Sequence, residues 1–211
     1  MFKIQITMRK LMALAAVALV VACCTNSVSH RCVSPLAAGY STDSLTDCNV
    51  PAQFTAADFD WQAGTLTMTV CSEDLYDAVE VNQLQPGDTL VFQGRSIVVQ
   101  KIEDADGIKT VNGGIEQGGA ELMAGDGGTY RGFQLDDHSV YTTLGKATVP
   151  VSSDLVLVDC GIEPNDPVDT IRNDARGHIQ KLGDRSDFNE LNTLVLIEGG
   201  KITQITRRWI P

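Results

Sequence analysis

The sequence predicts a mainly β domain, either an antiparallel sandwich or a partly open barrel, with one short amphipathic helix. Apolar and polar residues alternate over several short segments, which is the pattern of half-buried strands. Glycine-rich turns separate these segments, and the turn signals divide the chain into about ten strands. Only one segment has apolar residues three and four positions apart, as an amphipathic helix requires. The pattern alone does not distinguish a sandwich from a barrel.

The strands follow one another along the chain from residue 65. In residues 65–70, three apolar side chains alternate with threonines, so one face of this strand is expected to be buried. Pro86-Gly87-Asp88 and Gln93-Gly94-Arg95 are expected turns, the second of them inside a hairpin. Further short β segments are predicted at residues 78–82, 89–92, 97–102, 109–111, 130–133, 140–144, 147–151 and 155–158.

The predicted helix has a single apolar stripe. Its members are Ile171, Ala175, Ile179 and Leu182. Their spacing places them on one face of an α-helix. Asp169 is the expected N-cap, because a short carboxylate can accept hydrogen bonds from the first free N–H groups of a helix.

The last part of the chain predicts a β-hairpin. Residues 192–197 are apolar and rich in β-branched side chains. Gly199 and Gly200 then fit a two-residue turn in which both central residues need positive φ. Ile202 and Ile205 would not share a face under strict alternation, so a β-bulge is expected in the returning strand.

The start of the chain is not typical of a folded domain. Arg9 and Lys10 precede an apolar segment, residues 11–22, which ends at Cys23. The segment is shorter than the roughly 20 residues that a resident transmembrane helix needs. A basic segment, a short apolar segment and a small residue, in this order, are typical of an export signal.

Val20, Val21 and Ala22, followed by Cys23, resemble the lipobox of bacterial lipoproteins. The resemblance covers only the leader and this cysteine. It implies that residues 1–22 are a signal peptide, that Cys23 carries lipid, and that the protein is anchored in the bacterial cell envelope outside the cytoplasm. Ordinary signal-peptide cleavage, which would give a secreted protein, is the alternative.

The chain divides into three parts. Residues 1–22 form the signal peptide, and residues 23–57 contain the lipid-attachment cysteine, a tether and an irregular N-terminal wrap, because this stretch is polar with little periodicity. Residues 58–211 form the β-rich globular domain. The length fits one ordinary domain or two small ones.

The composition is acidic, with 27 acidic and 16 basic residues and a formal net charge of −11. Removal of the leader would take away Lys3, Arg9 and Lys10 and no acidic residue. This balance excludes nucleic acid as a partner, because phosphate backbones bind clustered basic residues. Membrane contact is therefore expected through the lipid on Cys23. A protein or glycan ligand stays open, and no cofactor is predicted.

Six cysteines fit an oxidising compartment, and lipidation of Cys23 would leave an odd number. Cys32 and Cys48 are candidates for a disulfide that closes a short loop. Cys71 and Cys160 end apolar segments, so they are either a disulfide between neighbouring strands or small buried hydrophobic residues. No pair has zinc-finger spacing, so no metal site is predicted.

Reactive residue types are densest at residues 136–139, Asp-Asp-His-Ser. His138 can transfer protons near neutral pH, and a carboxylate such as Asp136 could orient it. Adjacent residues cannot form a catalytic triad by themselves, since a triad is assembled from separated positions. A polar loop between strands is the favoured interpretation.

The sequence therefore favours a non-catalytic role in binding, adhesion or envelope structure. The alternative is a small secreted hydrolase that uses His138 with a nearby carboxylate such as Asp136. Tyr130, Tyr141 and Trp209 could form a face that binds a sugar or a peptide.

Overall fold

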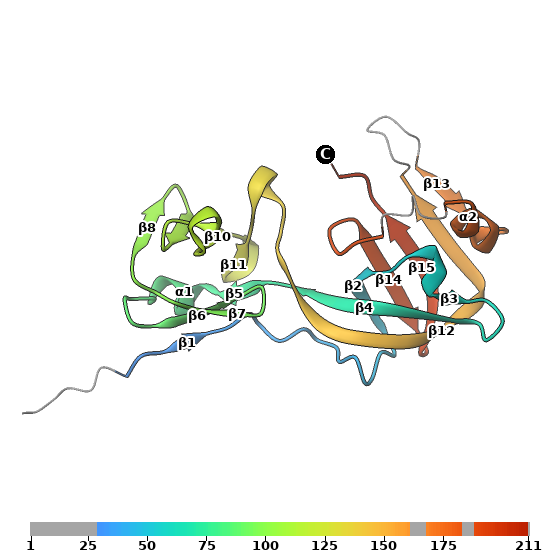
Figure 1. Cartoon of the computed structure of the whole chain (residues 1–211), viewed down its shortest axis with the longest axis horizontal. Helices are drawn as coiled ribbons and strands as arrows, with labels where there is room; N and C mark the ends of the chain where they lie inside the picture. Colours follow the sequence, from blue (N-terminus) through green and yellow to red (C-terminus); the bar gives the residue numbers. More distant parts are fainter. Residues whose placement is uncertain (1–28, 161–167, 183–187, 211) are drawn as a thin grey trace, which may run out of the picture.

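The computed structural model describes residues 29–160, 168–182 and 188–210. The chain forms two lobes that lie side by side along the long axis of the molecule (Figure 1). The predicted signal peptide and Cys23 lie outside the described residues. In the described part of the chain, no helix is long and apolar enough to cross a membrane.

The first lobe, called the barrel lobe here, contains a partly closed barrel of five strands. Going round the barrel, the strands follow the order β2, β4, β12, β15, β14, and β14 pairs again with β2. β12 and β15 are parallel, and the other pairs are antiparallel. β2 and β4 share only two residue pairs, Ala52–Val70 and Gln53–Thr69, so closure is partial. The strands are β2 (Cys48–Gln53), β4 (Thr65–Glu73), β12 (Tyr141–Asp159), β14 (Thr193–Glu198) and β15 (Lys201–Arg207), with β3 (Phe59–Asp60) and β13 (Asp169–Ile171) at the edges. This confirms a mainly β fold with a partly open barrel.

The barrel closes because β12 serves two neighbours. Residues 141–150 of β12 pair with β4, and residues 151–159 pair with β15 and β13. The β12–β4 register shifts between Thr143 and Gly145, and Gly145 has a φ of +150°. A bulge of this kind bends a strand, so one 19-residue strand can follow the wall of the barrel.

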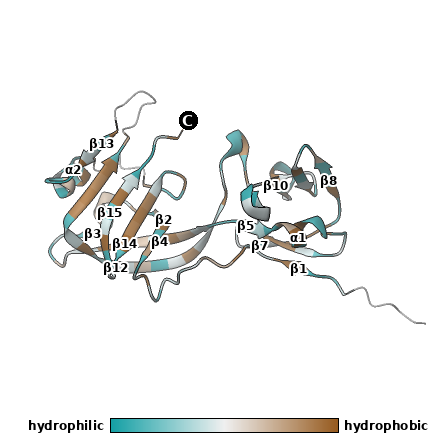
Figure 2. Ribbon diagram, turned by 180° about the vertical axis from the view of Figure 1, so that it is seen from behind, coloured by the Kyte–Doolittle hydropathy of each residue, from teal (hydrophilic) through white to brown (hydrophobic). Residues whose placement is uncertain are grey.

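The second lobe, called the inserted lobe here, is formed mainly by the chain between β4 and β12. It has one sheet of five strands and one of three, and a core separate from that of the barrel. Its strands are β5 (Leu75–Asp77), β8 (Ile102–Ala105), β9 (Ile108–Val111), β10 (Ala120–Ala124) and β11 (Thr129–Gly132) in the first sheet, and β1 (Cys32–Val33), β6 (Thr89–Phe92) and β7 (Arg95–Val98) in the second. Figure 2 shows hydrophobic segments along the strands of the barrel and hydrophilic ones in many of the connections.

The beginning of the described chain is fixed to the inserted lobe. β1 pairs in parallel with β6. The Arg31 backbone N–H donates to Asp88 Oδ1 at 2.9 Å, and its guanidinium donates to Asp88 Oδ2 at 3.2 Å. Thr89 N–H donates to the carbonyl of Arg31 at 2.8 Å. Together with β2, these contacts give regular structure to a stretch for which the sequence predicted a tether and an irregular wrap.

A buried carboxylate joins the two lobes. Asp74 lies between β4 and β5 and is fully buried. Its carboxylate accepts hydrogen bonds from the Gln93 N–H at 2.7 Å and the Thr142 hydroxyl at 2.6 Å. The Tyr76 hydroxyl lies 3.3 Å from it. Burial raises the pKa of Asp74, although these three hydrogen bonds oppose the rise.

The two helices differ from the expected positions. α1 (Ala78–Asn82) forms where a strand was predicted, because Asp77 accepts hydrogen bonds from the N–H groups of Val79 and Glu80. α2 (Ala175–Leu182) starts later than predicted, and Ile171 lies in β13 instead. Asp174 accepts the Gly177 N–H at 3.1 Å, so it takes the role expected for Asp169.

The predicted hairpins are confirmed. β6 and β7 pair around Gln93 and Gly94, which have φ of 51° and 70°. β14 and β15 pair around Gly199 and Gly200, both at positive φ. The register shifts between Leu196 and Ile197, which is the bulge that the spacing of isoleucines in the returning strand predicted.

Candidate functional site

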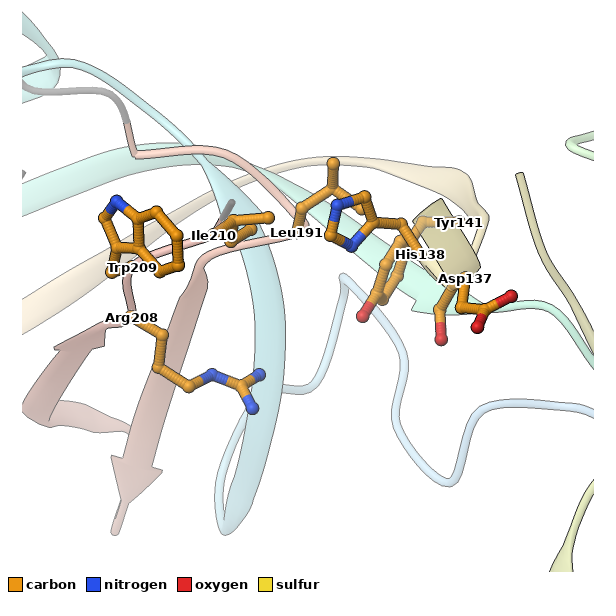
Figure 3. Close-up of a pocket in the computed structure, with 8 residues that line it drawn as sticks. Asp137, His138, Tyr141, Leu191, Arg208, Trp209 and Ile210 are labelled. Atoms are coloured by element: carbon orange, nitrogen blue, oxygen red, sulfur yellow. The ribbon is translucent and has the colours of Figure 1, made fainter. Parts of the chain in front are cut away.

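A pocket of about 290 Å³ lies between the turn that leads into β12 and the chain that follows β15. We call it the interlobe pocket. Figure 3 shows Trp209 and Arg208 on one side of it and His138, Tyr141 and Asp137 on the other. Its lining residues are Asp137, His138, Ser139, Tyr141, Leu191, Arg208, Trp209 and Ile210.

One wall of the interlobe pocket is a tight turn of the backbone. Asp136 and Asp137 both have a φ of 60°, a conformation that Asp adopts more readily than most residues. The Gln134 N–H donates to the His138 carbonyl at 2.9 Å, and Arg131 Nη1 donates to the Asp137 carbonyl at 2.8 Å. These bonds present the side chains of the turn to the pocket on a supported backbone.

The opposite wall is the segment after β15. The Arg208 N–H donates to the Asn192 carbonyl at 2.8 Å, which holds this segment against the turn before β14. Leu191 belongs to the same turn, and its N–H donates to Asn189 Oδ1 at 3.0 Å. Trp209 is 37% exposed, so its indole is available to a ligand.

The interlobe pocket carries charges of both signs. Burial raises the pKa of the Tyr141 hydroxyl, and the nearby Glu73 carboxylate raises it further. The Arg208 guanidinium acts in the opposite direction, and Glu190 adds to the rise. Tyr141 is therefore a neutral hydrogen-bonding group beside a cation, in surroundings suited to a polar ligand rather than to ionised tyrosine chemistry.

The two residues named for the alternative hydrolase, Asp136 and His138, are close in the chain, but among the described residues no hydrogen bond or ion pair joins them. They lie in the same turn and together line a neighbouring pocket of about 300 Å³. The hydroxyl of Ser139 donates to Glu73 Oε1 at 2.6 Å, so it is directed to a carboxylate and not to the imidazole that would activate it.

Two of the three aromatic residues proposed for a binding face do meet. Tyr141 and Trp209 both line the interlobe pocket. Tyr130 is 8% exposed and packs in the inserted lobe, where its hydroxyl lies 3.1 Å from Asn82 Oδ1. It is therefore a core residue. The sequence did not indicate Arg208, Leu191 or Ile210, although the basic and aromatic residues directly after the last strand were a usable signal.

The structure joins neither candidate cysteine pair, and all four thiols are free. Cys32 lies in β1 of the inserted lobe, whereas Cys48 lies in β2 of the barrel. Cys71 pairs with Thr143 near the start of β12, and Cys160 follows the last residue of that strand. Burial raises the pKa of Cys71 to about 11, which makes it a poor nucleophile.

A second polar cluster lies where β12 and β15 end. The Asp159 carboxylate and the Arg207 guanidinium form a buried bidentate pair, with both hydrogen bonds at 2.9 Å. His178 of α2 lies 3.2 Å from the same carboxylate. This cluster fixes α2 to the barrel. Among the described residues, no group of three or more His, Cys, Asp or Glu side chains could hold a metal ion.

The fold and the site together define a class of protein, a partly closed five-stranded β-barrel with a second lobe inserted after its second strand and an aromatic, charged pocket between the lobes. Comparisons with protein-family models, with curated proteins and with solved structures find no match.

Proposed function

We propose that this chain is an exported, lipid-anchored protein of the bacterial cell envelope that binds its ligand without catalysis. The short basic and apolar leader before Cys23 supports export and acylation. The interlobe pocket supports binding, because aromatic faces and a few polar groups on supported backbone are typical of ligand sites.

The observation that carries the binding role is the combination of Trp209 and Tyr141 with Arg208 in one open pocket. Indole and phenol rings offer flat apolar faces together with hydrogen-bonding atoms. Asp137, His138 and Arg208 surround these faces with donors and acceptors. A saccharide has the same mixture of C–H faces and hydroxyl groups, so we assign the pocket to a glycan.

The architecture gives weaker support. Small, partly open five-stranded barrels such as the OB-fold bind oligosaccharides and oligonucleotides with one face and the adjoining loops. The acidic composition disfavours oligonucleotides. Because folds host many functions, the assignment rests on the pocket residues.

Binding is tested by calorimetric titration with neutral oligosaccharides, beginning with the trimer of N-acetylglucosamine. Trp209→Ala should weaken binding at least about fivefold, since a base stacked on an aromatic side chain gains on the order of 1–3 kcal/mol and we expect a similar gain for a sugar ring. Val98→Ala removes an exposed apolar side chain outside the pocket and should leave affinity unchanged. Cleavage of the saccharide that disappears in His138→Ala would favour the hydrolase instead.

Anchoring is tested by mass spectrometry of the mature N-terminus and by cell fractionation. Cys23→Ser should abolish acylation and release the protein from the membrane fraction. Cys24→Ser, which alters the next residue, is the matched control and should stay anchored. An unacylated mature N-terminus in the wild-type protein would support plain secretion.

A further inference from the structure

Another cavity, of about 380 Å³, is lined by residues of the barrel lobe. We call it the Trp61 pocket. Three segments build it: the β3–β4 connection, the middle of β12, and the connection from β13 into α2. Its lining includes two arginines, Arg172 and Arg176, one aromatic ring, Trp61, and two apolar side chains, Val151 and Leu155.

Among the described residues, no acidic side chain pairs with either guanidinium group of the Trp61 pocket. Arg172 is exposed and makes no hydrogen bond or ion pair with any described residue. The guanidinium carbon of Arg176 lies 5.2 Å from the centre of the Trp61 ring. Asp174 is the one carboxylate in the lining. It accepts a hydrogen bond from the Gly177 N–H at 3.1 Å and so caps the first turn of α2.

These two cations are unusual in a chain whose formal net charge is −11. The net negative charge repels an anion, whereas this cavity presents two positive groups, one of which, Arg176, rests on the Trp61 ring. The guanidinium fork matches carboxylate and phosphate oxygens in a bidentate geometry. The local positive charge therefore favours an anionic ligand in this cavity.

Packing holds one of the cations in place. Trp61 stacks on Phe59 with ring centres 4.3 Å apart and an angle of 2° between the planes. Phe59 is 7% exposed, so the indole that supports Arg176 rests on the core. Val151 and Leu155 supply apolar lining, and partial removal of water strengthens the attraction between opposite charges.

We propose that the Trp61 pocket binds a small anionic molecule through a carboxylate or phosphate group held by Arg172 and Arg176. This site is separate from the glycan assigned to the interlobe pocket and does not depend on it. The cavity volume falls at the lower end of the range of small-molecule sites, roughly 300–1,000 Å³. It therefore fits a sugar acid or a sugar phosphate rather than a polymer.

The chain has only two tryptophans, Trp61 and Trp209, and each lines one pocket. In Trp209→Phe protein, tryptophan fluorescence therefore reports on the Trp61 pocket alone. This protein is titrated with inorganic phosphate, glucuronate and glucose at constant ionic strength. We expect a saturable change with phosphate or glucuronate and none with glucose. The anion that responds identifies whether phosphate or carboxylate is recognised.

The same titration is repeated after removal of two positive charges. Arg172→Ala with Arg176→Ala should weaken anion binding at least tenfold. Arg95→Ala with Lys146→Ala removes two exposed charges elsewhere and should preserve it. Arg172→Ala alone, at an exposed residue, provides a second test if the double variant does not fold. Absence of saturation with both anions, an equal response to glucose, or equal loss in the control variant would overturn the proposal.

Discussion

At the scale of single residues, Asp74 is a small side chain that binds several parts of the chain. It is fully buried and accepts hydrogen bonds from three different segments of the chain. Asp74→Ala would remove the acceptor of the Gln93 N–H and the Thr142 hydroxyl, which are both partly buried. We expect a loss of about 2–4 kcal/mol in the free energy of unfolding, measured by urea titration. Asp43→Ala, at an exposed carboxylate, should change it little, and equal losses in the two variants would contradict this role.

The protonation of Asp74 predicts a dependence of stability on pH. Burial raises the pKa of Asp74 in the folded state, whereas the unfolded chain has the ordinary value of about 3.9. The folded state therefore binds this proton more tightly. Its contribution is fully present below the ordinary pKa and is lost as the pH rises through the raised one. Relative to Asp74→Asn, the wild-type protein should lose stability as the pH rises from below the ordinary pKa through the raised one.

Urea titrations across that pH range measure the difference between the two proteins. Asp43→Asn removes one exposed carboxylate and controls for the change in net charge. A difference that grows in favour of the wild-type protein with rising pH would mean that hydrogen bonds to the carboxylate outweigh its burial.

The buried pair of Asp159 and Arg207 predicts a larger effect. Removal of one partner from a buried charge pair costs about 3–5 kcal/mol in other proteins. Arg207→Ala should lower the free energy of unfolding by this amount in chemical denaturation. Arg95→Ala, the same substitution at an exposed residue, is the control. If Arg207→Ala costs no more than this control, the pair is not a stabilising contact.

At the scale of elements, the last hairpin depends on two glycines. An added Cβ at Gly199 meets no atom within 4 Å, so only its φ of 56° opposes a side chain. Gly199→Ala should therefore cost about 1–2 kcal/mol, the price of a left-handed residue. Gly199→Asn should cost less, because Asn adopts this conformation more easily and Asn-Gly favours the same turn. Equal thermal stabilities of the two variants would argue against a conformational cause.

Local patterns were sufficient for the hairpins and insufficient elsewhere. Gly199 and Gly200 indicate their turn in the local sequence, and the structure adds Asp47 Oδ1 and the Thr46 carbonyl as acceptors of their N–H groups, both at 2.9 Å. At residues 78–82, alternating valines are compatible with a strand and with one helical turn. The N-cap formed by Asp77 stabilises the helix. β2 was missed because Pro51 interrupts its apolar pattern, although Val50 and Ala52 are fully buried in the barrel.

The sequence indicated one wall of the interlobe pocket and missed the other. The turn that contains His138 stood out by its composition. Its partners Arg208 and Trp209 are about seventy residues away in the chain. Only the return of β15 beside β12 brings them together, and pairing between distant strands leaves no local signal.

At the scale of the whole molecule, the two lobes have separate cores. Glu73 and Tyr141 are paired residues on adjacent strands. The chain therefore leaves the barrel for the inserted lobe and returns to it at neighbouring positions. Antiparallel partners lie about 5 Å apart, close enough for a two-residue turn to join them. We expect a chain of residues 40–210, with Asn-Gly in place of residues 74–140, to fold as the barrel alone.

Hydrogen exchange measured by NMR would check this. Amides of β14 and β15 should keep slow exchange, and unfolding in denaturant should remain a single transition. As a control, Leu157→Asp in the same shortened chain should abolish the protection, since Leu157 is fully buried in the barrel core. Fast exchange throughout the shortened chain would mean that the barrel needs its insertion.

The attachment of β1 to β6 also has a mechanical consequence. If the N-terminus is held at a surface, a pulling force on the chain reaches Arg31 and its clasp on Asp88 first. The inserted lobe would then bear the load, and the barrel would be shielded from stretching until that clasp gives way.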